Sequence, residues 1–149
     1  MKHIQKSQPF INYSSLTNSL FREDCIFFDI ETTGFSPKNA ALYLIGCLYK
    51  KESNIIVEQF LAESKDEQQE VLSHFIELAN NYTTIISFNG LGFDLPFIKT
   101  KCIDYEIFKP KHTMNHIDDT TDTLPTFDFF DKFHYIDIFK EASAIKHLL

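Results

Sequence analysis

The sequence has 149 residues, of which 44% are hydrophobic and 15% are aromatic, so it is long and apolar enough for one domain with a buried core. These fractions exclude a disordered chain. The formal net charge of −7 excludes a protein that coats nucleic acid non-specifically through a basic surface. An acidic chain still suits an enzyme whose carboxylates hold metal ions, because bound cations invert the local field.

The three cysteines are widely spaced and include no C-x-x-C pair, which argues against a zinc ribbon and a disulfide framework. Cys25 and Cys47 fall in apolar runs and are predicted to be buried thiols. We find no signal peptide and no long apolar span in the sequence. A cytoplasmic protein without membrane association is therefore expected.

The N-terminal residues 1–24 have a mixed composition and are predicted to be a lead-in to a single domain over 25–149. An almost wholly apolar run at 25–30 predicts a central strand that is buried on both faces. Similar runs at 41–49 and 54–61 follow after short connections. These three strands are therefore expected to be antiparallel neighbours.

The motif S-x-x-E at Ser64 to Glu67 is a capping box and predicts a helix that ends near residue 80. One face of this helix would carry the apolar stripe Leu72, Phe75, Ile76 and Ala79. A strand at 84–87 comes directly after the helix. A right-handed crossover would place it parallel to the first strand.

The second half of the chain predicts a short helix with Pro96 in its first turn, a mobile polar loop over 109–131, a strand at 133–137 and a helix at 138–149. The fold class is therefore α/β, with a mixed five-stranded sheet flanked by helices. Strands one to three would be antiparallel, and strands four and five would be parallel to strand one.

Two acids, Asp29 and Glu31, come at the end of the first strand in the run CIFFDIETTG. Alternate residues of a strand share a face, so the two carboxylates should lie side by side. A cation between them would relieve both their repulsion and their poor solvation, which predicts a hard-metal site. The alternative is that the acids only mark the point where the strand enters solvent.

A second polar turn, FNGLGFD at 88–94, follows the fourth strand. In one interpretation Asp94 is a third carboxylate facing Asp29 and Glu31, and Asn89 orients a ligand by hydrogen bonding. In the other, Asn89 and the glycines only form the turn and Asp94 caps the next helix. Both turns fall at carboxyl ends of strands, where sites form in α/β sheets.

The motifs FDIETTG and FNGLGFD resemble the first two motifs of the DEDD-type 3′→5′ exonucleases of the ribonuclease H-like superfamily, and most closely its YprB-like branch. The sequence around Asp137, Y-I-D-I, resembles the h-D-h strand of that family. The resemblance implies two divalent cations, Mg²⁺ or Mn²⁺, held by the catalytic acids Asp29, Glu31 and Asp94.

The resemblance also implies contacts with the substrate. Phe35 matches the position of an apolar wedge beside the terminal base, where its ring would either stack on that base or pack under the loop. We also expect substrate contacts from Thr32, Asn89 and Phe93.

The family pattern includes a fourth acid on a late helix, preceded by a Tyr or His that positions the attacking water. No such motif follows Asp137, so the chain is predicted to be truncated at its C-terminus. Asp137 itself would be a metal ligand or, in the favoured interpretation, a buried acid that has a structural role or supports the metal ligands. A truncated final helix would expose apolar surface and points to contact with a partner or a second copy.

The predicted function is a metal-dependent nuclease that hydrolyses DNA or RNA, acting as a 3′→5′ exonuclease on a single-stranded 3′ end. The alternative is a catalytically incomplete ribonuclease H-like module that binds nucleic acid or a partner. A different Mg²⁺-dependent phosphoryl-transfer enzyme would require a phosphate loop, and the sequence has no G-x-x-x-x-G-K-[ST].

Overall fold

The computed structural model describes residues 1–11, 14–108 and 129–145, and for residues 16, 144 and 145 it describes only the backbone. Its strands are β1 (Lys2–Pro9), β2 (Cys25–Thr32), β3 (Leu42–Lys51), β4 (Asn54–Leu61), β5 (Thr84–Ser87) and β6 (His134–Asp137). Its helices are α1 (Ser15–Leu20), α2 (Gln68–Ala79), α3 (Asp94–Asp104) and α4 (Ile138–Ile145), with short 3-10 helices η1 (Lys65–Glu67) and η2 (Phe129–Lys132).

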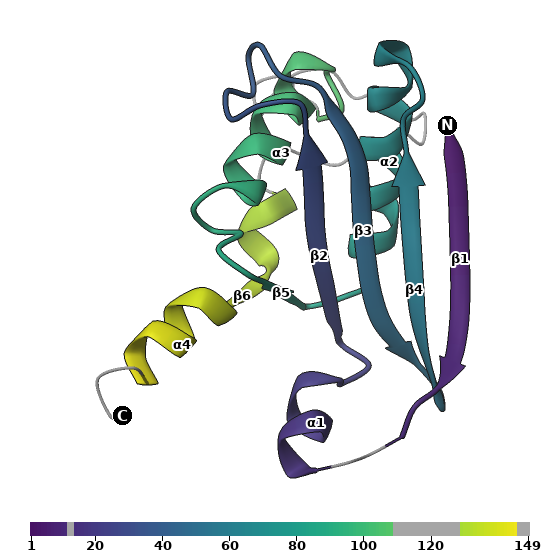
Figure 1. The fold of residues 1–149 in the computed structure, drawn as a ribbon, viewed down its shortest axis with the longest axis vertical. Helices are drawn as coiled ribbons and strands as arrows, with labels where there is room; N and C mark the ends of the chain where they lie inside the picture. The colour runs from purple at the N-terminus through teal and green to yellow at the C-terminus, as the bar shows by residue number, and fades with distance from the viewer. Residues whose placement is uncertain (12–13, 109–128, 146–149) are drawn as a thin grey trace, which may run out of the picture.

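The strands form a six-stranded mixed sheet in the order β1-β4-β3-β2-β5-β6 (Figure 1). The antiparallel pairing of β2, β3 and β4 is confirmed, as is the parallel pairing of β2 with β5 and of β5 with β6. The sheet has one strand more than predicted. This strand, β1, pairs antiparallel with β4 along its whole length, so part of the segment expected as a lead-in forms an edge of the sheet.

One face of the sheet is covered by α2 and α3, which lie behind it in Figure 1. The alternate β2 residues Ile26, Phe28 and Ile30 are buried on this side. The predicted stripe of α2 is confirmed, because its four residues are all buried in the same core cluster. Burial of this apolar stripe, rather than helix propensity, supplies most of the stability of such a helix.

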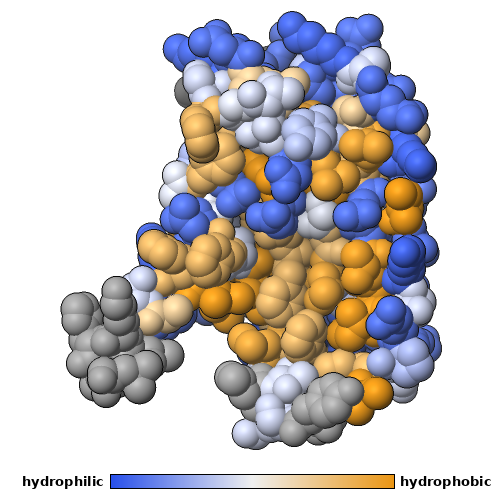
Figure 2. Space-filling model, viewed as in Figure 1, coloured by the Kyte–Doolittle hydropathy of each residue, from blue (hydrophilic) through white to orange (hydrophobic). Residues whose placement is uncertain are grey.

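The other face of the sheet is open in the part of the chain that the structure describes. Figure 2 shows an apolar patch over the middle of this face. On it, Phe27 is half-buried, and Asp29 and Glu31 are exposed. Cys25 on the same face is buried, so the prediction that the first strand is buried on both faces holds at its start and is wrong from Phe27 onward, because α2 and α3 lie on the opposite side.

The serine half of the predicted capping box is absent, since the Ser64 side chain makes no capping hydrogen bond. Glu67 Oε2 accepts a hydrogen bond from the backbone N–H of Glu63 at 2.7 Å, one residue before the expected partner Ser64. The helical segment begins with the single turn η1 and continues as α2. Gln68, which is buried, then accepts a hydrogen bond from Leu42 N–H at 2.8 Å and fixes the start of α2 against β3.

The remaining predicted elements differ mainly at their ends. Strand β6 and helix α4 occupy the predicted positions, and the last four residues of the predicted helix lie outside the described residues. Most of the loop predicted at 109–131 also lies outside them, and its last part forms η2. All three cysteines are free and buried, which confirms the prediction for Cys25 and Cys47. None of the helices within the described ranges combines the length and apolar character needed to cross a membrane.

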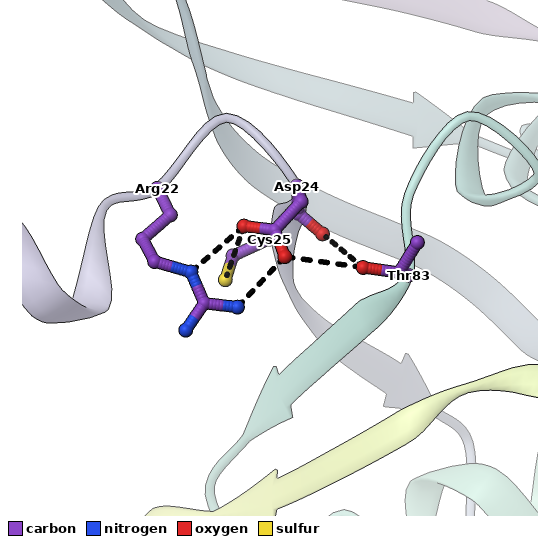
Figure 3. A network of polar contacts seen from close by, with 4 residues as sticks. All are labelled: Arg22, Asp24, Cys25 and Thr83. Carbon is purple, nitrogen blue, oxygen red and sulfur yellow. Dashed lines mark hydrogen bonds and ion pairs between the residues drawn. The ribbon is translucent and has the colours of Figure 1, made fainter.

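A polar network joins the first residues of β2 to those of β5 (Figure 3). Asp24 accepts two hydrogen bonds from the Arg22 guanidinium, at 2.8 and 2.7 Å, and one from the Thr83 hydroxyl at 3.1 Å. Its backbone carbonyl accepts the N–H groups of Thr83 and Thr84. Arg22 first, and then Thr83, hold the pKa of Asp24 well below its usual range. The network therefore fixes the parallel strands at the end opposite to the acids.

We expect Asp24→Asn to lower the free energy of unfolding at pH 7, because the substitution removes the charged partner of Arg22. Since the pKa of Asp24 is lowered by folding, its contribution is present above the unfolded pKa of about 3.9 and is lost as the pH falls through the lower folded value. Urea unfolding should therefore show a difference from wild type that shrinks below about pH 4. The neighbouring exposed acid offers a control: Glu23→Gln should show no comparable pH-dependent difference.

Candidate functional site

Asp29 and Glu31 lie near the end of β2, on the open face of the sheet. Both residues are exposed, and the alternate residues between and around them point into the core. The register of β2 against β3 shifts between Glu31 and Thr32, so the regular ladder ends there. The predicted placement of the two carboxylates on one face of one strand is therefore observed.

Asp94 is the first residue of α3 and lies at the same edge of the sheet. The parallel pairing of Cys25 to Phe27 with Thr84 to Ile86 makes β2 and the turn after β5 end side by side. Unlike Asp29, Asp94 is buried, with 5% of its surface exposed. Asp94 begins α3 but does not cap it: the N-cap is Phe93, and no side-chain capping hydrogen bond forms, so the alternative interpretation of Asp94 as the helix cap is not observed.

The charges of these carboxylates act on one another. Burial, and next the charge of Asp29, raise the pKa of Asp94 above its usual value, with a smaller contribution from Asp137. Although Asp29 is exposed, partial desolvation of its carboxyl raises its pKa, and the charge of Glu31 adds to the effect. Such mutual repulsion is what a bound cation relieves.

The acids meet in pairs rather than as a closed cluster. Among the described residues, no three His, Cys, Asp or Glu side chains stand close enough together to form a metal-binding group. The donor chemistry nevertheless suits a hard cation, since all three groups are carboxylates and Mg²⁺ or Mn²⁺ prefers oxygen ligands. In charge and ligand type the site fits a divalent ion. In geometry the site is incomplete, because the described residues do not bring three ligands close enough together to hold one ion.

The turn 88–94 is held in part by hydrogen bonds within its own backbone. Asn89 has a φ of 58°, in the left-handed region that Asn tolerates, and its carbonyl accepts the N–H groups of Gly92 and Phe93. Gly90 is required by space, since a Cβ there would lie 2.3 Å from Ser87 Oγ and 3.5 Å from Asp94 Oδ2. The backbone of this turn therefore lies directly against the Asp94 carboxylate.

Two of the predicted substrate contacts form an aromatic pair. Phe35 is 91% exposed, and its ring meets that of Phe93 edge-on with centroids 6.1 Å apart. Phe93 in turn contacts the buried ring of Phe97. The exposure of Phe35 removes the alternative that its ring packs beneath the loop. Thr32 Oγ donates to the Gly34 carbonyl at 2.8 Å, so its hydroxyl shapes the turn that carries Phe35.

A second exposed aromatic pair was not found from the sequence. Phe88 and Phe139, which are 63% and 47% exposed, meet edge-on with centroids 5.5 Å apart. They belong to segments far apart in the sequence, so no local pattern signals the contact. Phe88 also borders a groove of about 610 Å³ on the open face of the sheet. This groove contains Asp29 and Glu31 at one end, and its apolar lining includes Phe27, Leu44, Leu48, Val57 and Ile86.

Asp137, the last residue of β6, is buried with 3% of its surface exposed. Its carboxylate accepts hydrogen bonds from the backbone N–H groups of Asn89, Leu91 and Phe139. Its strand is separated from β2 by β5, as predicted. The Asp137 carboxylate therefore binds the backbone of the turn 88–94 and of the start of α4.

A family model of the RNase H superfamily matches residues 26–145, which include both acidic motifs and Asp137. The chain belongs to the RNase H superfamily. The six-stranded mixed sheet with helices is the fold expected of an RNase H-like protein.

Two curated relatives resemble this RNase H-like chain. It is 28% identical over 129 residues to the uncharacterized protein YprB of Bacillus subtilis (strain 168), covering 83% of the chain and 28% of YprB. It is 27% identical over 106 residues to the PolC-type DNA polymerase III of Clostridium perfringens (strain 13 / Type A), covering 56% of the chain and 7% of that protein. The chain thus spans less than a third of either relative.

Solved structures show the same RNase H-like fold. The family B DNA polymerase of Pyrobaculum calidifontis matches with a TM-score of 0.53 at 13% identity, covering 80% of this chain and 16% of the polymerase. Exonuclease I of E. coli, solved with a dT13 oligonucleotide, matches with a TM-score of 0.52 at 14% identity, covering 82% of this chain and 29% of the exonuclease.

We expect Gly90→Ala to lower the free energy of unfolding by about 1–3 kcal/mol, because the new Cβ would collide with both side-chain atoms of Ser87. Chemical denaturation measures the loss. Gly34→Ala is a matched control, since its Cβ would make an ordinary 3.6 Å contact with Ala40. That control should stay within about 1 kcal/mol of wild type. Equal losses in the two variants would contradict the close approach at Gly90.

Proposed function

We propose that this chain is a metal-dependent nuclease domain that hydrolyses phosphodiester bonds of DNA or RNA, and that it acts from a single-stranded 3′ end. One observation carries the proposal: in a chain of the RNase H superfamily, Asp29, Glu31 and Asp94 lie at one edge of the sheet, where, besides burial, the charge of Glu31 raises the pKa of Asp29 and the charge of Asp29 raises the pKa of Asp94. Relatives named as a DNA polymerase and an exonuclease support a nucleic-acid substrate. The 3′→5′ polarity rests on the resemblance of the motifs.

The three carboxylates would hold two divalent cations, Mg²⁺ or Mn²⁺. When bound, such ions neutralise charge on the phosphate and lower the pKa of a water nucleophile. The residues of the chain would bind and orient the strand around them. Asp94, buried beneath the turn, would supply a fixed oxygen, and the exposed Asp29 and Glu31 would approach from the open face.

The strand end would be held by the aromatic pair at Phe35 and Phe93. An exposed ring can stack on a base of any sequence, at about 1–3 kcal/mol per base. Thr32 holds the turn that presents Phe35, and the exposed Asn89 side chain would donate or accept hydrogen bonds from the sugar or base. Stacking on an unpaired base favours a single strand over a duplex.

A second candidate function follows from the pairwise arrangement of the acids. The described residues include no closed three-ligand group, so the chain would instead bind nucleic acid or a partner without turnover. Both candidates use the same surface. They differ in whether a bond in the bound strand is broken.

A cleavage assay separates the two candidates. We expect 5′-labelled single-stranded DNA or RNA, incubated with MnCl₂, to give a ladder of products shortened from the 3′ end. Asp29→Asn and Asp94→Asn should each lower the rate roughly 100-fold or more, because each removes a charged oxygen ligand. Glu77→Gln, an exposed acid on α2, is the control and should cleave at the wild-type rate.

The assay has two contrary outcomes. Strand binding by wild type, measured by fluorescence anisotropy, without any cleavage would favour the binding module. Cleavage that Asp29→Asn leaves unchanged would exclude the proposed site.

A thermal unfolding experiment tests the metal site separately. At pH 7 and an Mn²⁺ concentration 100 times the dissociation constant, binding should add about 2.7 kcal/mol to the free energy of unfolding. This gain should fade as the pH falls, because protons compete for Asp29 and Asp94, whose pKa values are raised. Asp94→Asn should abolish the gain.

The same substitution should have the opposite effect without added metal. Because folding raises the pKa of Asp94, its favourable contribution is present below the unfolded value and is lost as the pH rises through the folded value. Asp94→Asn should therefore raise the melting temperature at pH 7 when no divalent ion is present. A lowered melting temperature there would contradict repulsion at this site.

A further inference from the structure

The carboxylate of Asp137 is surrounded by backbone N–H groups from two separate segments. Oδ1 accepts from Asn89 at 2.8 Å and from Phe139 at 3.1 Å, and Oδ2 accepts from Leu91 at 3.3 Å. Three such bonds satisfy a buried carboxylate and fix its position in the low-dielectric interior. Both oxygens are thus engaged with the protein itself.

These hydrogen bonds stabilise a turn whose backbone conformation is unfavourable by itself. Asn89 has a left-handed backbone, with φ at 58°, and such a conformation persists only where its surroundings determine it. The Asp137 carboxylate bonds the N–H of that very residue and that of Leu91, two positions later. Without this acceptor, two N–H groups beside the acidic site would lose their partner.

The turn transmits its position to Asp94 through the backbone. The Asn89 carbonyl accepts N–H groups of Gly92 and Phe93 at 3.0 and 3.2 Å, and the Gly90 carbonyl accepts Leu95 N–H at 2.8 Å. The start of α3 is therefore bonded to the same turn. The virtual Cβ of Gly90 lies 3.5 Å from Asp94 Oδ2, so the turn also borders the carboxylate directly.

We infer that Asp137 is a positioning residue of the site: it fixes the turn 88–94, which carries Asn89, and thereby places Asp94 beside Asp29. The inference rests on the proposed nuclease function. It assigns Asp137 a role through hydrogen bonds to the backbone rather than as a ligand, because Oδ1 and Oδ2 both already accept N–H groups. It also makes the start of α4 part of the same unit, through Phe139 N–H and the ring contact of Phe139 with Phe88.

The test compares two substitutions of buried carboxylates. Asp137→Asn keeps the shape of the side chain but turns an NH₂ group toward one of the bonded N–H groups. Glu58→Gln is the matched control: Glu58 is also buried, bonds His3 and the Tyr49 hydroxyl, and lies on β4, two strands from β2. Stability is measured by urea unfolding, Mn²⁺ affinity by calorimetric titration, and kcat and KM with a single strand.

We expect both variants to be less stable than wild type, and only Asp137→Asn to bind Mn²⁺ at least tenfold more weakly with a lowered kcat. Asp137→Ser should weaken Mn²⁺ binding in the same way, since its short hydroxyl can cap α4 but cannot reach the turn. Mn²⁺ affinity in folded Asp137→Asn equal to that of Glu58→Gln would overturn the positioning role. Failure of both Asp137 variants to fold would also overturn it, by showing that the fold itself requires the carboxylate.

The outcomes also separate this inference from the proposed function. If wild type neither binds Mn²⁺ nor cleaves a strand, the proposed function fails and the positioning role fails with it. If wild type does both and Asp137→Asn behaves like Glu58→Gln, only the positioning role fails.

Discussion

The parallel pairing of β2 with β5 is the constraint on which the site depends. Three registered residue pairs, from Cys25 with Thr84 to Phe27 with Ile86, align two strands that β3, β4 and α2 separate in the sequence. The Asp24 network fixes their starting ends, so their carboxyl ends finish at one edge of the sheet. Asp29 and Glu31 lie at the end of β2, Asp94 follows the turn after β5, and Asp137 ends the neighbouring strand β6. This is the place where α/β sheets form binding sites.

At this edge the chain accepts an electrostatic cost. Asp94 is buried next to another acid, and a protein of net charge −7 gains nothing in stability from a further buried negative charge. Structural needs would be met by an apolar residue or an amide at that position. Unfavourable interactions of this kind gather at functional sites, where a ligand supplies the missing compensation. The cost is local, because the helix-covered core beneath the site is a cluster of buried apolar side chains.

Much of this architecture was predictable from the sequence because it depends on local pattern. The bounds of β4 and β5 match the apolar runs, and the stripe of α2 follows helical spacing. Strand β1 was missed because an edge strand is exposed on both faces: its residues are mostly polar and solvent-accessible, so no alternation marks it. The Ser64 side chain does not form the predicted capping bond, and the helical segment begins with a 3-10 turn.

The positions of the three acids were predictable from the sequence, but the hydrogen bonds and ring contacts that hold the surrounding turn were not. Asp29, Glu31 and Asp94 stand out as acids at the ends of apolar strands, so their meeting at one edge could be anticipated. The bonds of Asp137 could not, because they go to main-chain N–H groups, which every residue but proline carries. The Phe88–Phe139 contact was hidden for a similar reason, since it joins segments that no spacing rule connects.

The hydrogen bond between Asn89 and Asp137 joins residues 48 positions apart, and this separation affects the order in which the protein can be built. On the ribosome, β2, β5 and the turn emerge well before β6. Until β6 has emerged and paired with β5, the N–H groups of Asn89 and Leu91 have only water as an acceptor. The turn therefore gains two of its stabilising hydrogen bonds only after β6 is in place. A nascent chain would carry all three acids of the site in a sheet that has not yet fixed their geometry.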